Sequence, residues 1–398
     1  MRTRTYRTAL LSTLLLAGCT PRETMPELTD RVFAVAAAQY EQLEGRLTDE
    51  TLPRSVASDG KFIPSNIRWW CSGFYPGSLW YIYEYTGDKT FRELAEKNTF
   101  KLYPLKQKGT DHDLGFQMNC SFGNAYRITG EQKYLEPIHT SARVLAGRFS
   151  PVTGVIRSWD FVRKGRDWKY PVIIDNMMNL ELMFKATEFS GDSTYYNIAV
   201  KHADRTMKEH FRDDYSCYHV VDYDLTTGDV RGRCTAQGYA DDSAWARGQA
   251  WAVYGYTACY RYTGDKRYLD HARKVAGFML DDKNMPADLV PYWDYDAPNI
   301  PNEPRDVSTA AIIASAFYEM YTYTGDGLYK QKADRIVESL SSPAYRAPGG
   351  GNGGFLLMHS VGSIPHGSNI DVPLNYADYY FLEALIRKGR LEAGEPLF

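Results

Sequence analysis

The sequence predicts an all-α fold, an (α/α)6 barrel built from six helical hairpins, and three observations lead to this prediction. A turn of the form Thr/Ser-Gly-Asp/Glu occurs five times, each time between two stretches with the length and composition of helices. The spacing between these turns varies, which disfavours a short-period solenoid. Helices near the two ends of the chain supply a sixth pair, and six hairpins that close in a ring form such a barrel.

Each turn has the residues that end one helix and begin the next. The glycine can adopt the left-handed conformation at a helix C-terminus, and the acidic residue after it favours the N-terminus of the following helix. An aromatic residue, Phe91 in the first copy and Tyr in the others, follows a few residues later. The five turns are Thr86-Gly87-Asp88, Thr129-Gly130-Glu131, Ser190-Gly191-Asp192, Thr263-Gly264-Asp265 and Thr324-Gly325-Asp326.

The sixth hairpin is predicted from the two ends of the folded region. A C-terminal helix over about 378–388, ended by Gly389, would pair with an N-terminal helix over about 28–47. The five turn glycines lie 43 to 73 residues apart, so the connections differ in length. Because no Pro-, Ser- or Gly-rich linker and no block of charge divides the chain, we expect a single domain over 28–398.

The first 18 residues are predicted to be a secretory signal of the lipoprotein type. Three arginines precede an apolar run over 9–17, which is too short to span a bilayer and leads into Gly18 and Cys19. This order is typical of a bacterial signal that is cleaved before a lipidated cysteine, although an accidental Cys after an ordinary signal is the alternative. We expect residues 19–27 to be a short tether that holds the protein at the bacterial cell envelope, with the lipid as its only contact with the membrane.

Composition excludes some classes of partner. The formal net charge of −3 gives no basic field, so nucleic acid is not expected as a partner. The 31 Tyr, 17 Phe and 8 Trp suit a sugar-binding surface or the packing of wide helices. Besides Cys19 the cysteines are odd in number and form no CxxC pair, which argues against a disulfide framework and a zinc site and for small buried side chains. They are Cys71, Cys120, Cys217, Cys234 and Cys259.

The positions about seventeen residues before each turn glycine are predicted to gather at one mouth of the barrel. At 1.5 Å per residue they lie roughly 25 Å from the turn, near the start of each inner helix. Such N-terminal ends attract anions through free N–H groups and the helix dipole. These positions hold Trp70, Asp113, Asp175, Arg247 and Ser308, with Asp306 two residues before the last.

Asp113 and Asp175 are the candidate catalytic pair. Each carboxylate stands just ahead of an apolar helix, Asp113 within the run 111–116 and Asp175 after the apolar run 172–174. Taken singly, either aspartate could be a helix N-cap. At equivalent points of neighbouring hairpins the two fit acid and base work better. Burial or a second carboxylate raises a carboxyl pKa whereas a helix N-terminus lowers it, so the sequence leaves open which aspartate holds the proton.

Arg247 and Trp251 are the candidate sugar clamp. They are four residues apart and share one face of a helix, so the guanidinium could bind the carboxylate of a uronic acid while the ring stacks on the sugar. The alternative is a structural arginine paired with Asp241 or Asp242, with Trp251 in the core. A histidine such as His219 is, in isolation, more often structural than catalytic.

Seven motifs follow one another in a fixed order between residue 28 and the C-terminus. They are Trp70-Cys71-Ser72-Gly73-Phe74, His112-Asp113-Leu114-Gly115-Phe116, Ile174-Asp175, Tyr218-His219, Trp245-Ala246-Arg247-Gly248-Gln249-Ala250-Trp251, Pro291-Tyr292-Trp293-Asp294 and Asp378-Tyr379-Tyr380-Phe381-Leu382-Glu383-Ala384-Leu385. As a set they resemble the unsaturated glucuronyl hydrolases, glycoside hydrolase family 88. One departure is Tyr75, where members of this family commonly have Trp, so that wall of the pocket can differ.

The resemblance implies an (α/α)6 barrel and an unusual glycosidase mechanism without metal or organic cofactor. The carboxylate at Asp175 would protonate C4 of a C4=C5 double bond and activate the water that adds at C5, with Asp113 as a second essential carboxylate. The substrates would be oligosaccharides that end in an unsaturated uronate. The residues that match the uronate pocket are Trp70, His112, His219, Gln237, Arg247 and Trp251.

A loop over 360–368 lies where some relatives contact the aglycone or its sulfate. Ser363, His366 and Ser368 are the expected contacts, although a plain Gly/Ser surface loop is the alternative. The loop has no Lys or Arg, so we do not expect it to bind sulfate strongly.

Two rival functions stay open on the sequence alone. An unsaturated rhamnogalacturonyl hydrolase shares the fold, and a non-catalytic sugar-binding surface lipoprotein would also suit aromatic helices and an anchor. Binding alone, however, gives no reason for two carboxylates at matching hairpin positions. The parent polysaccharide and the oligomeric state are not indicated.

Overall fold

The computed structural model describes residues 24–57, 59–161 and 165–398. The predicted signal peptide, the anchor at Cys19 and most of the predicted tether lie outside these residues. Within the described ranges, no helix has both the length and the apolar character needed to cross a bilayer.

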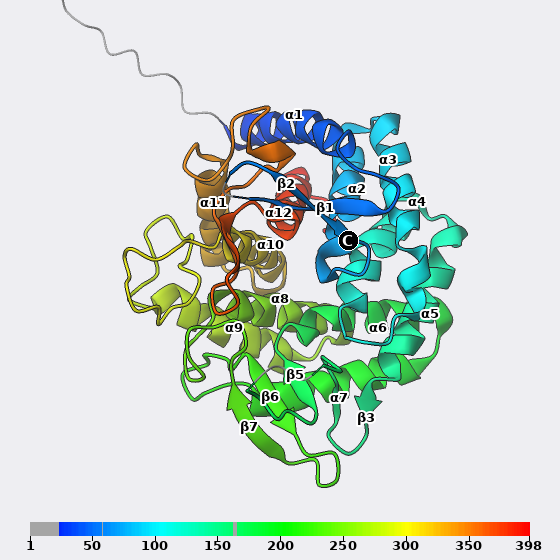
Figure 1. The fold of residues 1–398 in the computed structure, drawn as a ribbon, viewed down its shortest axis with the longest axis vertical. Coiled ribbons are helices and arrows are strands. Elements are labelled where there is room, and N and C mark those ends of the chain that lie inside the picture. The colour runs from blue at the N-terminus through cyan, green and yellow to red at the C-terminus, as the bar shows by residue number, and fades with distance from the viewer. Residues whose placement is uncertain (1–23, 58, 162–164) are drawn as a thin grey trace, which may run out of the picture.

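The helices follow one another round a ring in the order of the sequence (Figure 1). Each inner element contacts the next and the last contacts the first, so the ring is closed and the predicted (α/α)6 barrel is confirmed. The inner elements are α2 (Phe74–Thr86), the π-helical segment Gly115–Gly123 with α4 (Asn124–Thr129), α6 (Asn176–Ser190), α8 (Ala246–Thr263), α10 (Val307–Thr324) and α12 (Asn375–Ala393). The outer helices are α1 (Met25–Glu44), α3 (Lys89–Lys101), α5 (Leu135–Ala146), α7 (Ser193–Glu209), α9 (Lys266–Asp281) and α11 (Gly327–Ser341).

The pattern of hydrophobic residues separates the inner layer from the outer. In α10 every residue from Val307 to Met320 is buried, because this helix has neighbours on all sides. In α9 the buried residues recur at helical spacing on one face, as in Ala272, Val275 and Met279, and the other face is polar. The five cysteines within the described residues are all buried and unpaired, as predicted.

The five predicted turns join inner to outer helices. Their glycines all have positive φ, between 65° and 72°, which a side chain would strain. Four of the acidic residues accept the backbone N–H two residues further on, at 2.8–3.0 Å, and so cap the outer helix. Glu131 is the exception, because its longer side chain pairs with Arg92 and Lys133 and a short 3-10 turn, Gln132–Tyr134, precedes α5.

The sixth hairpin differs from the prediction at both ends. α1 begins at Met25 rather than near residue 28, because Thr24 and Glu27 form a capping box that fixes its first turn. The prediction that Gly389 ends the last helix is wrong. α12 continues to Ala393, and Gly394, with φ of 71°, ends it instead. The ion pair between Lys388 and Glu392 spans Gly389 and stabilises the helix there.

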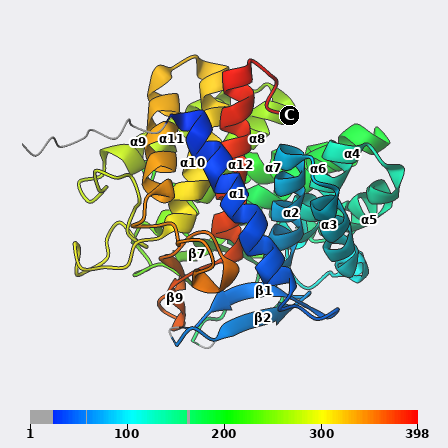
Figure 2. The same cartoon turned by 90° about the horizontal axis from the view of Figure 1, so that it is seen from above.

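Short antiparallel strands occupy several connections between the helices, which the all-α prediction did not include. Figure 2 shows β1, β2, β7 and β9 at one end of the barrel. The pairs are β1 (Thr51–Val56) with β2 (Phe62–Asn66), β3 (Phe149–Ser150) with β4 (Val155–Ile156), and β8 (Ser360–Ser363) with β9 (Ser368–Val372). A three-stranded sheet has the order β5 (Pro171–Ile173), β6 (Val220–Tyr223) and β7 (Val230–Cys234).

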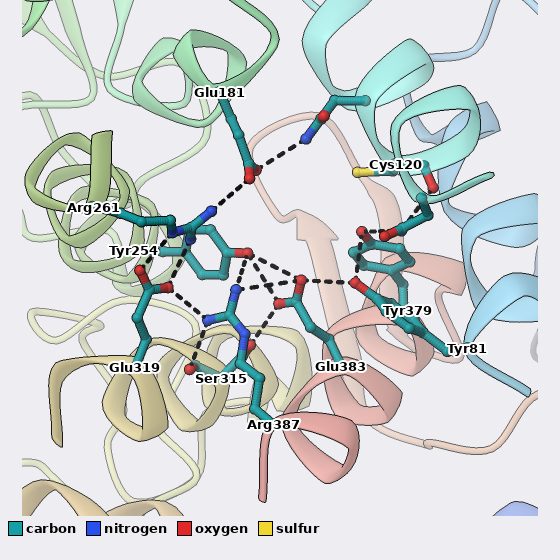
Figure 3. Close-up of polar contacts among 12 residues, drawn as sticks. Tyr81, Cys120, Glu181, Tyr254, Arg261, Ser315, Glu319, Tyr379, Glu383 and Arg387 are labelled. Carbon is teal, nitrogen blue, oxygen red and sulfur yellow. Dashed lines mark hydrogen bonds and ion pairs between the residues drawn. The ribbon is translucent and has the colours of Figure 1, made fainter. Parts of the chain in front are cut away.

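Toward the C-terminal ends of the inner helices, buried polar side chains fill the barrel axis (Figure 3). Glu319 accepts hydrogen bonds from Arg261 at 2.7 and 2.8 Å and from Arg387 at 3.0 Å. Glu383 accepts from Tyr81 at 2.8 Å and from Tyr254 at 3.0 Å. With Glu181 and Asn119 included, every inner element of the barrel contributes to this network, which we call the floor.

The floor leaves little free space. A cavity of about 30 Å³, large enough to hold an ordered water molecule, lies among Glu181, Lys185 and Glu383. The ring of Phe398 lies 3.8 Å from the guanidinium of Arg261 and covers this end of the axis. The barrel is therefore closed at the floor.

Candidate active site

A pocket of about 410 Å³ opens at the N-terminal ends of the inner helices. Four of the predicted rim residues line it together, which confirms that they gather at one mouth: Trp70, Asp113, Asp175 and Arg247. Gln237 and the three loop residues Ser363, His366 and Ser368 line it as well. Ser308 is fully buried and does not reach the wall.

Close packing of two neighbouring hairpins brings the aspartates together. A Cβ on Gly115 would lie 2.4 Å from Asn179 of α6, so only glycine allows the π-helical segment to approach this closely. The N–H of Phe116 donates to Oδ1 of Asn179 at 2.8 Å across the same contact. Asp175 precedes α6 but its side chain makes no capping hydrogen bond, and Asp113 lies before the N-cap position of its segment. Asp175 thus occupies the N-cap position of α6 without a side-chain capping bond, and neither carboxylate caps its helix.

Asp113 sits in a setting that favours its protonated form. Burial, the negative charge of Asp111 and that of Asp175 raise the pKa of the Asp113 carboxyl well above its usual range, against the opposing charge of Lys108. Lys108 lies 2.8 Å from Asp111, which in turn accepts the backbone N–H of Asp113 at 3.1 Å. The surroundings of Asp113 therefore favour the protonated form of its carboxyl.

His112 supports Asp113 from behind the pocket wall. It is fully buried, and its Nε2 lies 3.5 Å from Oδ1 of Asp113. Burial lowers the pKa of His112 to about 3, so the ring is neutral at physiological pH. It does not line the pocket, and the predicted direct contact with the uronate is not seen.

His219 holds the corresponding place behind Asp175. Its Nδ1 accepts the backbone N–H groups of Ala236 at 3.0 Å and Gln237 at 3.1 Å, which assigns the proton of a neutral ring to Nε2. Nε2 lies 3.6 Å from Oδ2 of Asp175, so the ring presents a donor to this carboxylate. His219 also stands outside the pocket wall.

Arg247 is buried, and hydrogen bonds fix the orientation of its guanidinium group. Its Nη1 donates to Asp306 at 3.0 Å and to the carbonyl of Val361, and its Nη2 donates to the carbonyl of Gly362 at 2.7 Å. The alternative partner Asp241 is wrong, because it pairs with Arg166 at the surface. Three of the five guanidinium N–H groups are thus used, and among the described residues Nε has no hydrogen-bond partner. The remaining donors suit a carboxylate ligand.

Trp251 does not reach the pocket, so its predicted stacking on a sugar is wrong for this structure. It lies one helical turn deeper than Arg247, is fully buried, and packs against Phe116 and Tyr380 at centroid distances of 5.2 and 5.5 Å. Trp70 does line the wall and lies 5.0 Å from the ring of Tyr376. Trp70 is therefore the better placed of the two tryptophans for contact with a ligand.

Several residues of the site were not predicted. Asp306 caps α10 and holds Arg247, and its place two residues before a rim position was a signal that could have found it. Arg54 of β1 lies 3.5 Å from the hydroxyl of Ser368, so a cation does stand beside the loop that has none of its own. Further wall residues come from connections with no sequence signal: Arg68, Lys108, Trp159, Phe161 and Tyr376. Within the described ranges, no group of three or more His, Cys, Asp or Glu is arranged to hold a metal.

A closed α/α barrel with a pocket lined by a carboxylate pair and a buried arginine is typical of a carbohydrate-active enzyme. Comparisons with known proteins identify the family. Residues 45–257 match the model of Glycosyl Hydrolase Family 88. The chain is 45% identical to an unsaturated glucuronyl hydrolase of Formosa agariphila, over 89% of this chain and 90% of that protein. It is 33% identical to an unsaturated chondroitin disaccharide hydrolase of Streptococcus pneumoniae, over 85% and 86%.

Solved structures agree with this assignment. The crystal structure of an unsaturated glucuronyl hydrolase specific for heparin is 44% identical and covers 92% of this chain and 98% of its own, with a TM-score of 0.89. The chain therefore belongs to glycoside hydrolase family 88 and is a glycosidase, which confirms the resemblance read from its motifs.

Proposed function

We propose that this enzyme removes a terminal 4,5-unsaturated glucuronate from lyase-generated glycosaminoglycan oligosaccharides by hydrating the C4=C5 double bond. The observation that carries the proposal is the pocket itself, where Asp113, Asp175 and the buried cation Arg247 line one space. A uronate carboxylate bound by Arg247 would place the neighbouring double bond near the two aspartates. The relatives named above act on substrates of this chemistry.

Each residue has a role in the proposed reaction. Asp175 gives a proton to C4, water adds at C5 while Asp175 accepts a proton from it, and the resulting hemiketal opens and releases the aglycone. In the first step Asp175 is the proton donor, and Asp113, whose carboxyl pKa is raised by burial and by the charges of Asp111 and Asp175, lines the same pocket as the second carboxylate. His219 orients Asp175, and His112 orients Asp113. In this reaction the glycosidic bond is not attacked directly. The distance between the two carboxylates therefore does not predict retention or inversion at the anomeric carbon, as it does in other glycosidases.

The test is the loss of the ultraviolet absorbance of the double bond. The wild-type enzyme should remove this absorbance from unsaturated disaccharides, and Asp175→Asn should abolish the change while the melting temperature stays the same. Asp242→Asn, an exposed carboxylate outside the pocket, is the matched control and should keep full activity. Turnover by Asp175→Asn near the wild-type rate would overturn the assigned role, and a preference for unsaturated galacturonyl-rhamnose would favour the rhamnogalacturonyl alternative.

Heparin-derived disaccharides are the proposed preferred substrates. The heparin-specific structure is 44% identical to this chain, whereas the chondroitin disaccharide hydrolase of Streptococcus pneumoniae is 33% identical. The loop over 360–368 has no cation of its own, but Arg54 lies beside it, 3.5 Å from the hydroxyl of Ser368, and is the candidate contact for a sulfate on the aglycone. A panel of unsaturated disaccharides from heparin, chondroitin and hyaluronan tests this, and a higher kcat/KM for chondroitin products would refute it.

We further propose that Cys19 carries lipid and holds the enzyme at the cell envelope. The order of charge, apolar run and Leu16-Ala17-Gly18-Cys19 supports this. In cells, Cys19→Ser should move the enzyme from the membrane fraction to the soluble fraction and abolish labelling with a fatty acid. An unchanged membrane fraction would contradict the anchor.

A further inference from the structure

The β8–β9 hairpin reaches into the pocket from outside the ring of helices. Its strand β8 presents two successive carbonyls, those of Val361 and Gly362, to the guanidinium of Arg247. The carbonyl of Gly362 also accepts a hydrogen bond from Nε2 of Gln237 at 3.2 Å. Two wall residues from separate parts of the chain thus converge on one carbonyl.

The same hairpin is tied to the barrel by a buried carboxylate. Oδ1 of Asp306 accepts the backbone N–H of Val361 at 3.2 Å, while Oδ2 accepts from Arg247 at 3.0 Å. Asp306 is itself fixed at the start of α10, where it also accepts the hydroxyl of Ser308 at 2.6 Å. Arg247 is therefore clamped between one helix and one hairpin, and the direction of its remaining donors depends on both.

Gly362 has no room for a side chain. An added Cβ would lie 2.9 Å from Cβ of Asn369 and 3.0 Å from the carbonyl oxygen of Ser368, both on the opposite strand β9. The strands would have to separate by a few tenths of an ångström, and the carbonyl of Gly362 would move with them. A small shift of this kind lengthens hydrogen bonds to a charged group, which are among the strongest in proteins.

We propose that Gly362 is a positioning residue whose carbonyl, held by the β8–β9 hairpin, aims Arg247 and Gln237 at the carboxylate of the substrate. The proposal rests on the function proposed above, in which Arg247 binds the uronate. Gly362 itself lines the pocket, but in this proposal it acts through Arg247 and Gln237. Because glycine has no side chain, the β8–β9 hairpin can hold this carbonyl where it positions Arg247. The hairpin therefore influences the affinity for the charged sugar as well as the contact with the aglycone.

The experiment begins with Gly362→Ala. We expect KM for an unsaturated disaccharide to rise about tenfold with kcat changed less than threefold, because binding of the uronate weakens while the aspartates stay in place. Ile370→Ala, at an exposed position of β9 outside the pocket wall, is the control for a general disturbance of the hairpin and should leave KM unchanged. The melting temperature of each variant shows whether it has folded.

A second substitution separates positioning from misfolding. Asn369 has φ of +53°, a conformation that glycine adopts readily, and Asn369→Gly removes the Cβ that the new alanine would meet. Gly362→Ala combined with Asn369→Gly should therefore recover part of the lost affinity, because only the contact with the carbonyl oxygen of Ser368 remains, and Asn369→Gly alone is the reference. A double variant as weak as Gly362→Ala would overturn the proposal.

Two further readouts connect the effect to Arg247. In the Arg247→Ala background, Gly362→Ala should add less than twofold to KM, since the group that it aims is absent. Gly362→Ala should also raise KM for the methyl glycoside of the unsaturated uronate, which has no sugar aglycone. Full additivity, or an effect confined to the disaccharide, would show that Gly362 acts elsewhere. Because the wild-type enzyme is assayed alongside, a failure of the proposed function would appear as absent wild-type turnover.

Discussion

Removing one charge from the floor of the barrel should destabilise the whole ring. Glu319 is fully buried and accepts hydrogen bonds from two arginines and from Tyr323. In Glu319→Gln the side chain keeps its volume, but Arg261 and Arg387 each lose one carboxylate partner and keep Glu181 and Glu383, respectively. Leaving a buried charge wholly without a partner costs about 3–5 kcal/mol of the free energy of unfolding, out of a total of roughly 5–15 kcal/mol, so this range is the largest loss expected.

This loss of free energy lowers the melting temperature. With an unfolding entropy of about 2.1 cal/mol/K per residue over the described chain, the loss corresponds to a decrease of about 5 °C. Scanning calorimetry measures it directly. Glu131→Gln, which breaks half-exposed pairs with Arg92 and Lys133, is the matched control and should lower the melting temperature by about 1 °C or less. Equal decreases in both variants would refute the view that the floor network holds the ring together.

Three other expectations follow from the site and its surroundings. Arg247→Ala should weaken binding of the uronate substrate by at least tenfold but hardly affect an uncharged analogue, and equal losses in inhibition assays would indicate a structural arginine. Trp251→Phe should lower the free energy of unfolding by roughly 1–3 kcal/mol and leave KM within twofold of the wild-type value. A large rise in KM would instead support the sugar contact that the sequence predicted. Burial raises the pKa of Asp378 to about 7, above its value in the unfolded chain. The contribution of this group to stability is therefore complete below about pH 4 and is lost as the pH rises through 7, and the loss in the free energy of unfolding is at most about 4 kcal/mol. Melting curves from pH 5 to 8 should therefore fall less steeply for Asp378→Asn than for the wild type, and parallel curves would contradict this.

The hairpin framework could be predicted because its signals are local. A glycine that must take a positive φ and an acidic residue that caps the next helix act within four or five residues, so the repeated turns located five hairpins. Counting back from these turns also placed Asp113, Asp175 and Arg247 at one mouth, since the inner helices have similar lengths. Gly389 misled the same reasoning, because a glycine inside a helix looks like one that ends it.

The rest of the site depends on contacts between distant segments. Asp306 lies 59 residues from Arg247 in sequence, and the carbonyl of Gly362 is 115 residues away. Backbone groups have no sequence signature, so the carbonyls of Val361 and Gly362 could not be predicted from the motifs, whereas the position of Asp306 beside a rim residue was a signal. The depth of Trp251 was missed for a related reason, since helical spacing gives the face of a residue but not its distance from the mouth.

The closed floor has a consequence for the kind of polymer end that the enzyme can use. A channel open at both ends would let a sugar chain pass through, whereas here salt bridges and the ring of Phe398 block the axis beyond the pocket. Whatever reaches Asp113 and Asp175 must enter and leave by the same mouth. We therefore expect the enzyme to act on a chain end that enters the pocket, not on a chain threaded through the barrel.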